Sequence, residues 1–154
     1  MLNEKEIQEI NAELAHCPTK ASASIEALNI VQRHHGWVSD ESLKDVAQLL
    51  EMTLEELDAV ATFYSFIFRQ PVGRHVILVC DSISCWVMGY NPLLDVLKDK
   101  LGISFGETTE DNRFTLLPIS CLGACDRAPA MMVDDDLYGP VSPDMMEEII
   151  QNYE

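Results

Sequence analysis

Five cysteines occur in the 154-residue chain, and four of them form two close pairs. Cys80 and Cys85 have the spacing C-x4-C, Cys121 and Cys125 have C-x3-C, and thirty-five residues lie between the pairs. Thiolates are soft ligands that bind zinc and iron–sulfur clusters. In a reducing compartment, clustered thiols are more typical of metal or redox chemistry than of structural disulfides. The two pairs therefore predict a four-thiolate site.

The placement of the pairs in the predicted elements strengthens this interpretation. Residues 75–80 and 114–119 are short apolar runs typical of buried strands, and Cys80 ends the first run while Cys121 follows the second. The intervening stretch predicts one helix, over residues 91–101, so the segment has the content of a β-α-β unit. Because the two strands of such a unit run parallel, we expect both cysteine pairs at one edge of the sheet.

The spacing favours a 2Fe–2S cluster and leaves two alternatives open. The compact C-x2-C-x2-C run of two-cluster ferredoxins is absent, and a 2Fe–2S cluster takes four cysteines. Gly89 and Gly123 would let backbone amides approach the sulfur atoms. A structural zinc site prefers C-x2-C but tolerates wider spacing, so a zinc-stabilised interaction module remains an alternative. A thioredoxin-like thiol enzyme would need C-x-x-C, which neither pair has.

The first half of the chain predicts four helices. Pro18 and Gly36 end the first two, Ser39 or Asp40 begins the third, and the capping box Thr53–Glu56 begins the fourth. The side chains expected on the inner face of the first helix are Leu2, Ile7, Ile10 and Leu14.

The second half predicts strand, helix, strand, strand, strand and helix. Residues 130–133 and 137–141 indicate a hairpin around the acidic turn Asp134–Asp136, which we expect to be solvated. Ser142 is expected to cap the last helix, with Pro143 at its first position. Together with the helical first half, this order predicts an α+β protein.

Charge and hydropathy exclude several classes of function. Ten Lys and Arg stand against 26 Asp and Glu, a net charge of -16, which repels phosphate backbones and anionic lipids. With 47% hydrophobic residues the chain is not disordered. Its longest bulky uncharged stretch, residues 59–68, is half of the roughly 20 residues that a membrane helix needs, and its start does not resemble a signal peptide. We expect a soluble protein in a reducing compartment.

Other residues that could carry chemistry have simpler interpretations. We expect Cys17 to be a free thiol, and His34 and His35 to suit the negative end of a helix dipole rather than to bind metal. Arg69 and Arg74 flank the junction between the two halves, where they could fix the junction or contact a partner. The aromatic residues expected in the core or at a subunit contact are Phe63, Tyr64, Phe66 and Phe68.

In combination, several segments carry a resemblance to a known family over about residues 20–154. These segments are Ala61–Tyr64, Phe68–His75, Cys80–Ser82 with Cys85, Gly89 and Tyr90, and Cys121–Cys125 with Asp126, Pro129 and Met131. The chain resembles the E subunit of bacterial NADH:quinone oxidoreductase, respiratory complex I. That resemblance implies a helical bundle over residues 1–72 and a thioredoxin-like α/β domain with a four-stranded mixed sheet over residues 73–154. Trp86 departs from the smaller polar or His residue common in related chains, and we expect it to shield the cluster from water.

The resemblance also implies a function. Cys80, Cys85, Cys121 and Cys125 would hold one 2Fe–2S cluster, which takes an electron from a flavin. FMN and NADH would belong to a partner subunit, because no G-x-G-x-x-G motif follows a strand here. The chain would form a heterodimer with that partner in the peripheral arm of complex I, cytoplasmic and peripheral to the inner membrane, and would not be active alone. Related chains serve NAD-linked hydrogenases and formate dehydrogenases, which remain alternatives.

Overall fold

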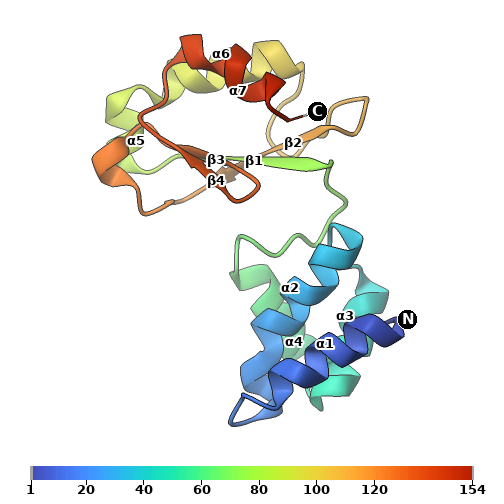
Figure 1. Ribbon diagram of the computed structural model, residues 1–154. Coiled ribbons are helices and arrows are strands. Elements are labelled where there is room, and N and C mark those ends of the chain that lie inside the picture. The colour runs from blue at the N-terminus through green and yellow to red at the C-terminus, as the bar shows by residue number, and fades with distance from the viewer. Residues whose placement is uncertain (1, 154) are drawn as a thin grey trace. The chain divides into compact units, whose positions relative to one another are not determined.

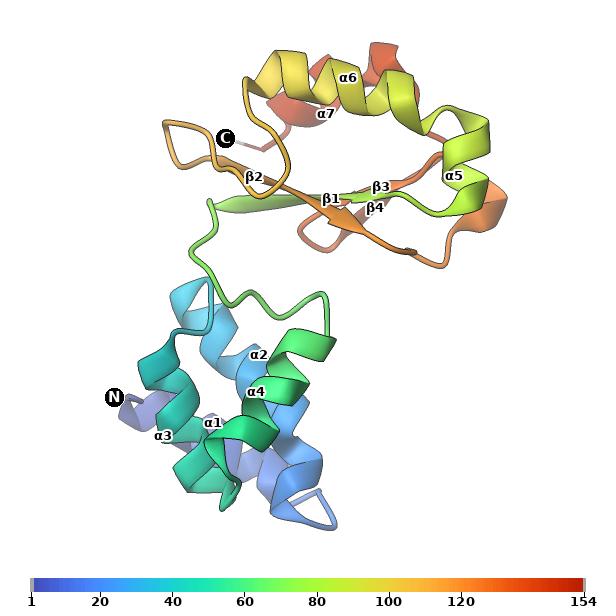
Figure 2. The ribbon, with the colours of Figure 1, turned by 180° about the vertical axis from the view of Figure 1, so that it is seen from behind.

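The computed structural model describes residues 2–153, and the chain divides into two compact units between Pro71 and Val72. Residues 1 and 154, the outer ends of the two predicted domains, lie outside the described residues. The first unit contains helices only, and the second contains a sheet with helices (Figures 1 and 2). Each unit has its own apolar core.

The four predicted helices of the first unit are confirmed, and their ends follow from local chemistry. Ser39 and Thr53 accept hydrogen bonds from backbone N–H groups three residues on, which satisfies donors that the first turn would leave free. Gly36 ends the second helix at φ 81°, a conformation that glycine adopts without a Cβ clash. The elements are α1 (Glu4–Leu14), the 3-10 turn η1 (Lys20–Ala23), α2 (Ser24–His35), α3 (Asp40–Leu50) and α4 (Leu54–Phe63).

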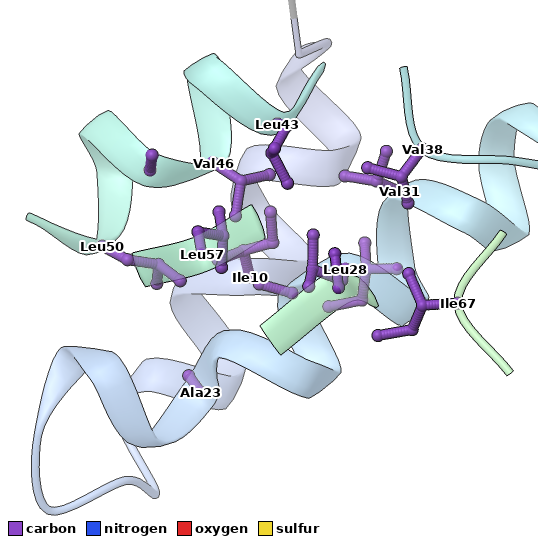
Figure 3. Packing of buried hydrophobic residues seen from close by; sticks show 14 residues of the cluster. Ile10, Ala23, Leu28, Val31, Val38, Leu43, Val46, Leu50, Leu57 and Ile67 are labelled. Atoms are coloured by element: carbon purple, nitrogen blue, oxygen red, sulfur yellow. The ribbon is translucent and has the colours of Figure 1, made fainter. Parts of the chain in front are cut away.

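All four helices contribute to one buried apolar cluster (Figure 3). Ile10 of α1, Leu28 of α2, Val46 of α3 and Leu57 of α4 are fully buried within it. Each such side chain contributes roughly 1.5–3 kcal/mol when it leaves water. This cluster, rather than helix propensity, is what holds helices of only 10–12 residues together.

One prediction for α1 is wrong: Ile7 is 37% exposed, and Glu6 is fully buried instead. The reason is a capping box, in which Asn3 accepts from the Glu6 N–H and Glu6 Oε2 accepts from the Asn3 N–H at 2.7 Å. Glu6 Oε1 makes no hydrogen bond but lies 2.7 Å from His35 Nε2, so the imidazole of α2 faces this buried carboxyl group. His34 Nε2 lies 3.2 Å from Glu9 Oε2, so both histidines face α1 carboxylates.

In the second unit, the sheet has the order β2-β1-β3-β4 and is mixed, as predicted. Strand β1 pairs in parallel with β2 and antiparallel with β3, and β3 and β4 form the predicted hairpin. Strand β4 ends before Gly139-Pro140, because proline has no N–H for the ladder. The strands are β1 (His75–Cys80), β2 (Phe114–Ile119), β3 (Met131–Val133) and β4 (Asp136–Tyr138).

Helices α6 (Tyr90–Leu101) and α7 (Met146–Gln151) lie on the same face of this sheet in both views (Figures 1 and 2). Their apolar sides share a core with the strands. Its fully buried members include Ile77, Val79, Leu93, Leu97, Phe114, Leu116, Met131 and Met146.

Two predictions about helices of the second unit need correction. Between β1 and β2 there are two helices, not one, because α5 (Ile83–Met88) precedes α6 and the chain turns between them at Gly89, φ 123°. Before α7, Ser142 makes no side-chain cap, and Pro143 begins the 3-10 turn η3 (Pro143–Met145) rather than the helix itself.

The acidic turn is also more than a solvated loop. Asp134 accepts from the Val76 N–H at 2.9 Å and lies 2.7 Å from His75 Nδ1, so it fastens the hairpin to the start of β1. Asp136 accepts from the Tyr153 hydroxyl at 2.7 Å. The turn therefore ties the hairpin both to the first strand and to the C-terminal segment.

Arg69 belongs to the first unit's own structure. Its guanidinium donates to Asp58 Oδ1 at 3.2 Å, to Asp40 Oδ1 at 2.6 Å and to the Val38 carbonyl, and its side chain is only 18% exposed. It therefore fastens the segment after α4 to the start of α3 and to α4 itself. Of the two interpretations of Arg69, a fixing role within this unit is the one that its contacts support.

We predict that Arg69→Ala lowers the free energy of unfolding of the helical unit by about 2 kcal/mol, because three charged hydrogen bonds are lost. Arg33→Ala is the matched control, since Arg33 makes one ion pair with Glu26 and is 61% exposed; its effect should stay within ~0.5 kcal/mol. Urea denaturation followed by far-UV circular dichroism measures both. Equal effects of the two substitutions would contradict this role for Arg69.

Candidate metal centre

The parallel pairing of β1 and β2 brings the two cysteine segments to one edge of the sheet. Cys80 is the last residue of β1 and is in register with Ile119, the last residue of β2, and Cys121 follows two residues later. The Asp81 N–H donates to the Ile119 carbonyl at 3.0 Å, so the pairing continues past Cys80. The prediction that both strands deliver cysteines to the same edge is confirmed.

The second cysteine of each pair lies on a short helical turn at this edge. Cys85 is in α5, and Cys125 begins the 3-10 turn η2 (Cys125–Arg127). These two turns lie side by side in both views (Figures 1 and 2), and a hollow of about 410 Å³ opens between them. The hollow is lined by Ile83, Ser84, Val87, Met88 and Cys125.

The four thiols differ in exposure. Cys80 and Cys85 are buried, whereas Cys121 and Cys125 are exposed, and all are free. Burial raises the pKa of the Cys85 thiol, a hydrogen bond with Cys80 and the charges of Cys80 and Cys125 raise it further, and a backbone hydrogen bond with Ala130 opposes the rise. Cys80 and Cys125, one from each pair, therefore both act on the Cys85 thiol.

Cys121 has a different environment. Its Sγ accepts a hydrogen bond from the Gly123 N–H at 3.3 Å, and Gly123 has φ 73°, which glycine tolerates best. An amide aimed at sulfur is the kind of contact that stabilises a negatively charged thiolate ligand. Gly123 thus has the role that the sequence predicted for it.

The donor set fits an iron–sulfur group in chemistry: four thiols, two of them buried, and an amide donor to one sulfur. Within residues 2–153, no three His, Cys, Asp or Glu side chains stand close enough to form a ready-made site for one metal ion. The cysteines therefore fit an iron–sulfur group in the type of their donor atoms and in lying at the same edge of the sheet. They do not form a preformed coordination site.

The remaining candidates lie elsewhere. Cys17 packs against the core of the helical unit, and His34 and His35 face α1 carboxylates there. Of the aromatic cluster, Phe63, Tyr64 and Phe66 are exposed, so a core role is wrong for these three. Nowhere between residues 2 and 153 is a helix long and apolar enough to cross a membrane.

Sequence reasoning missed the exposed apolar surface of α5. Trp86, expected to shield a cluster, is 56% exposed, and Ile83, Val87 and Met88 beside it are at least as open. The available signal was the run of residues 82–94, which has no charged residue in a strongly acidic chain. That run does not show that a separate helix, α5, turns its apolar side chains to solvent.

Comparison with known proteins agrees with the family resemblance found in the sequence. Residues 10–154 match the family of thioredoxin-like 2Fe-2S ferredoxins. The chain is 47% identical over 153 residues to the E subunit of the NADH-quinone oxidoreductase of Pseudomonas aeruginosa, covering 99% of this chain and 92% of that protein. It is 46% identical over 152 residues to the E subunit of the Escherichia coli enzyme, with the same coverage of both chains.

The fold is also found in a solved structure. A chain of the NAD+-reducing NiFe-hydrogenase in the H2-reduced state superposes with a TM-score of 0.72 at 22% identity, over 85% of this chain and 22% of that one. At this identity the likeness shows the fold alone. From the residues matched and the identity over nearly its whole length, the chain belongs to the thioredoxin-like 2Fe-2S ferredoxins, in the family of the E subunits of NADH-quinone oxidoreductases.

Proposed function

We propose that this chain carries one 2Fe–2S cluster, held by Cys80, Cys85, Cys121 and Cys125, as the electron-transfer subunit of an NADH-quinone oxidoreductase. The observation that supports this most is the convergence of both cysteine segments at one sheet edge, in a chain 46–47% identical to such E subunits over nearly its whole length. When bound, such a cluster supplies reversible one-electron transfer.

The chain's own residues bind and tune this group. Cys80 and Cys85 hold it from the buried side, and Cys121 and Cys125 hold it from the exposed side. The Gly123 N–H stabilises negative charge on the Cys121 sulfur. Asp81 and Asp126, next to two of the thiols, oppose the addition of an electron.

The partner in this proposal is the subunit that binds FMN and NADH, as a heterodimer within the peripheral arm, on the cytoplasmic side of the inner membrane. Exposed Phe63, Tyr64 and Phe66 support a contact through the helical unit, because large exposed aromatics are enriched at protein interfaces. Arg69 is not part of this surface, since its guanidinium is already bonded within the unit.

A second candidate is the equivalent diaphorase subunit of an NAD-linked hydrogenase or formate dehydrogenase. The shared fold with a chain of an NAD+-reducing hydrogenase favours it, and the identity of 22%, against 47% for the E subunit of the Pseudomonas aeruginosa oxidoreductase, weighs against it. The proteins that co-purify with the chain at native expression levels will distinguish these two candidate functions. A zinc-stabilised interaction module, the alternative of another class, is tested by metal content.

We predict two iron and two acid-labile sulfide per chain after anaerobic purification, with a rhombic electron paramagnetic resonance signal after reduction, as the 2Fe–2S ferredoxin family implies. Metal and sulfide analysis of the same sample provides the measurement. Stoichiometric zinc without sulfide in reconstituted protein would favour the interaction module instead.

We predict that Ala at position 80, 85, 121 or 125 removes one thiolate and makes the cluster labile or absent, by visible absorption and iron content. Cys17→Ala is the control, because Cys17 packs in the other unit's core, and it should leave the spectrum unchanged. A normal cluster in Cys121→Ala together with its loss in Cys17→Ala would refute the ligand assignment.

We predict that NADH does not reduce the cluster of the isolated chain, and reduces it once the flavin-binding subunit is added. The reason is that the chain has no dinucleotide-binding motif. Anaerobic stopped-flow absorbance with and without the partner measures the rates. Comparable rates in both samples would show that the assignment of NADH to the partner is wrong.

A further inference from the structure

A segment that contains no cysteine, residues 127–130, connects three of the four candidate ligands. It continues directly from the 3-10 turn η2, which begins with Cys125. The Ala130 carbonyl accepts a hydrogen bond from the Cys80 N–H at 3.2 Å, and a backbone hydrogen bond also joins Ala130 to the Cys85 thiol. The position of this segment, which we call the bridging segment, therefore affects where three of the thiols lie relative to one another.

The bridging segment is itself held by the chain that follows β4. The Arg127 Nε–H donates to the Gly139 carbonyl at 3.0 Å, and the Val141 N–H donates to the Pro129 carbonyl at 2.9 Å. One hydrogen bond is thus made at each end of residues 139–141, so this stretch lies against most of the bridging segment. Nothing in its residue types marks it as part of a metal centre, and only the folded chain places it there.

Gly139 is the closest point of this contact. A Cβ atom at position 139 would lie closer than 3.0 Å to the Arg127 carbonyl oxygen and 3.1 Å from the Arg127 Cβ. Real Cβ atoms essentially never come closer than 3.0 Å to such a neighbour, so one of the two segments must shift when another residue stands here. Glycine lets the two backbones approach this closely because it has no Cβ.

The turn that carries Cys125 is the part that yields. Position 139 is held on both sides, because Tyr138 before it pairs with Met131 in the sheet and Val141 after it is buried. By contrast, η2 has only three residues, and all three are exposed. A side chain at position 139 therefore displaces Cys125 and the bridging segment, and leaves the hairpin in place.

We propose that Gly139, together with the Arg127 that it contacts, is a positioning residue of the candidate metal centre that sets the place of Cys125; this inference rests on the proposed function. Gly139 is not a ligand, and it acts by leaving room for the Arg127 backbone. Groups behind the ligands orient them and tune the metal. A displaced Cys125 therefore changes both the spectrum of a bound cluster and the strength with which the chain holds it.

The test compares Gly139→Ala with Gly73→Ala in the full chain, each loaded anaerobically with its cluster. Gly73 is the matched control, because a Cβ there would also meet backbone atoms, those of Arg113 and Asn112 at 3.1 Å, but at the opposite end of β1 from Cys80. Gly139→Ala should shift the g values of the reduced cluster in electron paramagnetic resonance and speed the loss of iron to the chelator ferrozine roughly tenfold. Gly73→Ala should leave both unchanged, whatever its effect on unfolding by urea.

A second variant decides the matter where Gly139→Ala does not fold. Arg127→Ala keeps the room at position 139 and removes only the side-chain hydrogen bond to its carbonyl, so it should shift the same g values by a smaller amount. Arg74→Ala is its control, because it removes an exposed charge of the same unit at the other end of β1, and it should give the wild-type signal. If Gly139→Ala does not fold, a wild-type signal in Arg127→Ala refutes the inference.

The remaining outcomes are equally decisive. If Gly139→Ala keeps the wild-type g values and the wild-type rate of iron loss, the inference is wrong and the proposed function stands. If Gly73→Ala changes both readouts as much as Gly139→Ala does, the cluster responds to a general loss of stability, and the inference is wrong. If the wild type holds zinc and no sulfide, the proposed function fails, and this inference with it.

Discussion

The parallel pairing of β1 with β2 is the constraint on which the candidate site depends. Six consecutive pairs, from His75 with Phe114 to Cys80 with Ile119, hold the two strands in one register. Because both strands run the same way, they end at the same edge; Cys80 ends β1 and Cys85 follows it, whereas Cys121 and Cys125 both follow the end of β2. A shift of register by one residue would move alternate side chains to the wrong face of the sheet and separate the two loops. The apolar side chains of β1 and β2 therefore position the two cysteine pairs, of which only Cys80 belongs to a strand.

Packing at this edge is uneven in a way that suits electron exchange. Cys80 and Cys85 are buried against the sheet and α5, whereas Cys121 and Cys125 lie on the open side. A fully buried site would keep a redox partner at a distance, and a fully open one would leave the thiols to water and oxidants. Exposed apolar side chains of α5, among them Ile83, Val87 and Met88, line the hollow on this open side together with Cys125. The cost is a surface that the isolated chain leaves unfavourably hydrated.

The helical unit is stabilised without strand pairing. Its helices are short, so caps and one buried apolar cluster hold them in place. Two polar contacts add to this: Arg69 fastens the segment after α4, and Glu6, buried in α1, faces His35 of α2. The aromatic side chains at and after the end of α4, Phe63, Tyr64 and Phe66, remain outside the core. The core of the unit is thus built from aliphatic side chains, whereas Phe63, Tyr64 and Phe66 lie exposed.

Much of the fold is determined by local sequence. Helix ends follow from Gly36, Ser39 and Thr53, because capping uses atoms only a few residues apart. The strands ending at Cys80 and Ile119, and the common edge of the cysteine pairs, follow from apolar runs and the geometry of a β-α-β unit. Identity over nearly the whole chain then shows the family.

Tertiary structure decides what depends on residues distant in sequence. Periodicity placed Ile7 inside and could not show that Glu6 takes that place, because the side chain that faces Glu6 is His35, on another helix. An acidic turn gave no sign that Asp134 would bind the start of β1, 58 residues away. The exposure of Trp86 was equally hidden, since an uncharged apolar run has no polar side to reveal its orientation, and only the packing of Cys85 inward turns the rest of α5 to solvent. Local chemistry specifies the helices, the strands and the types of the candidate ligands. Burial and long-range pairing exist only in the folded chain, and they decide which side chains around the site are exposed.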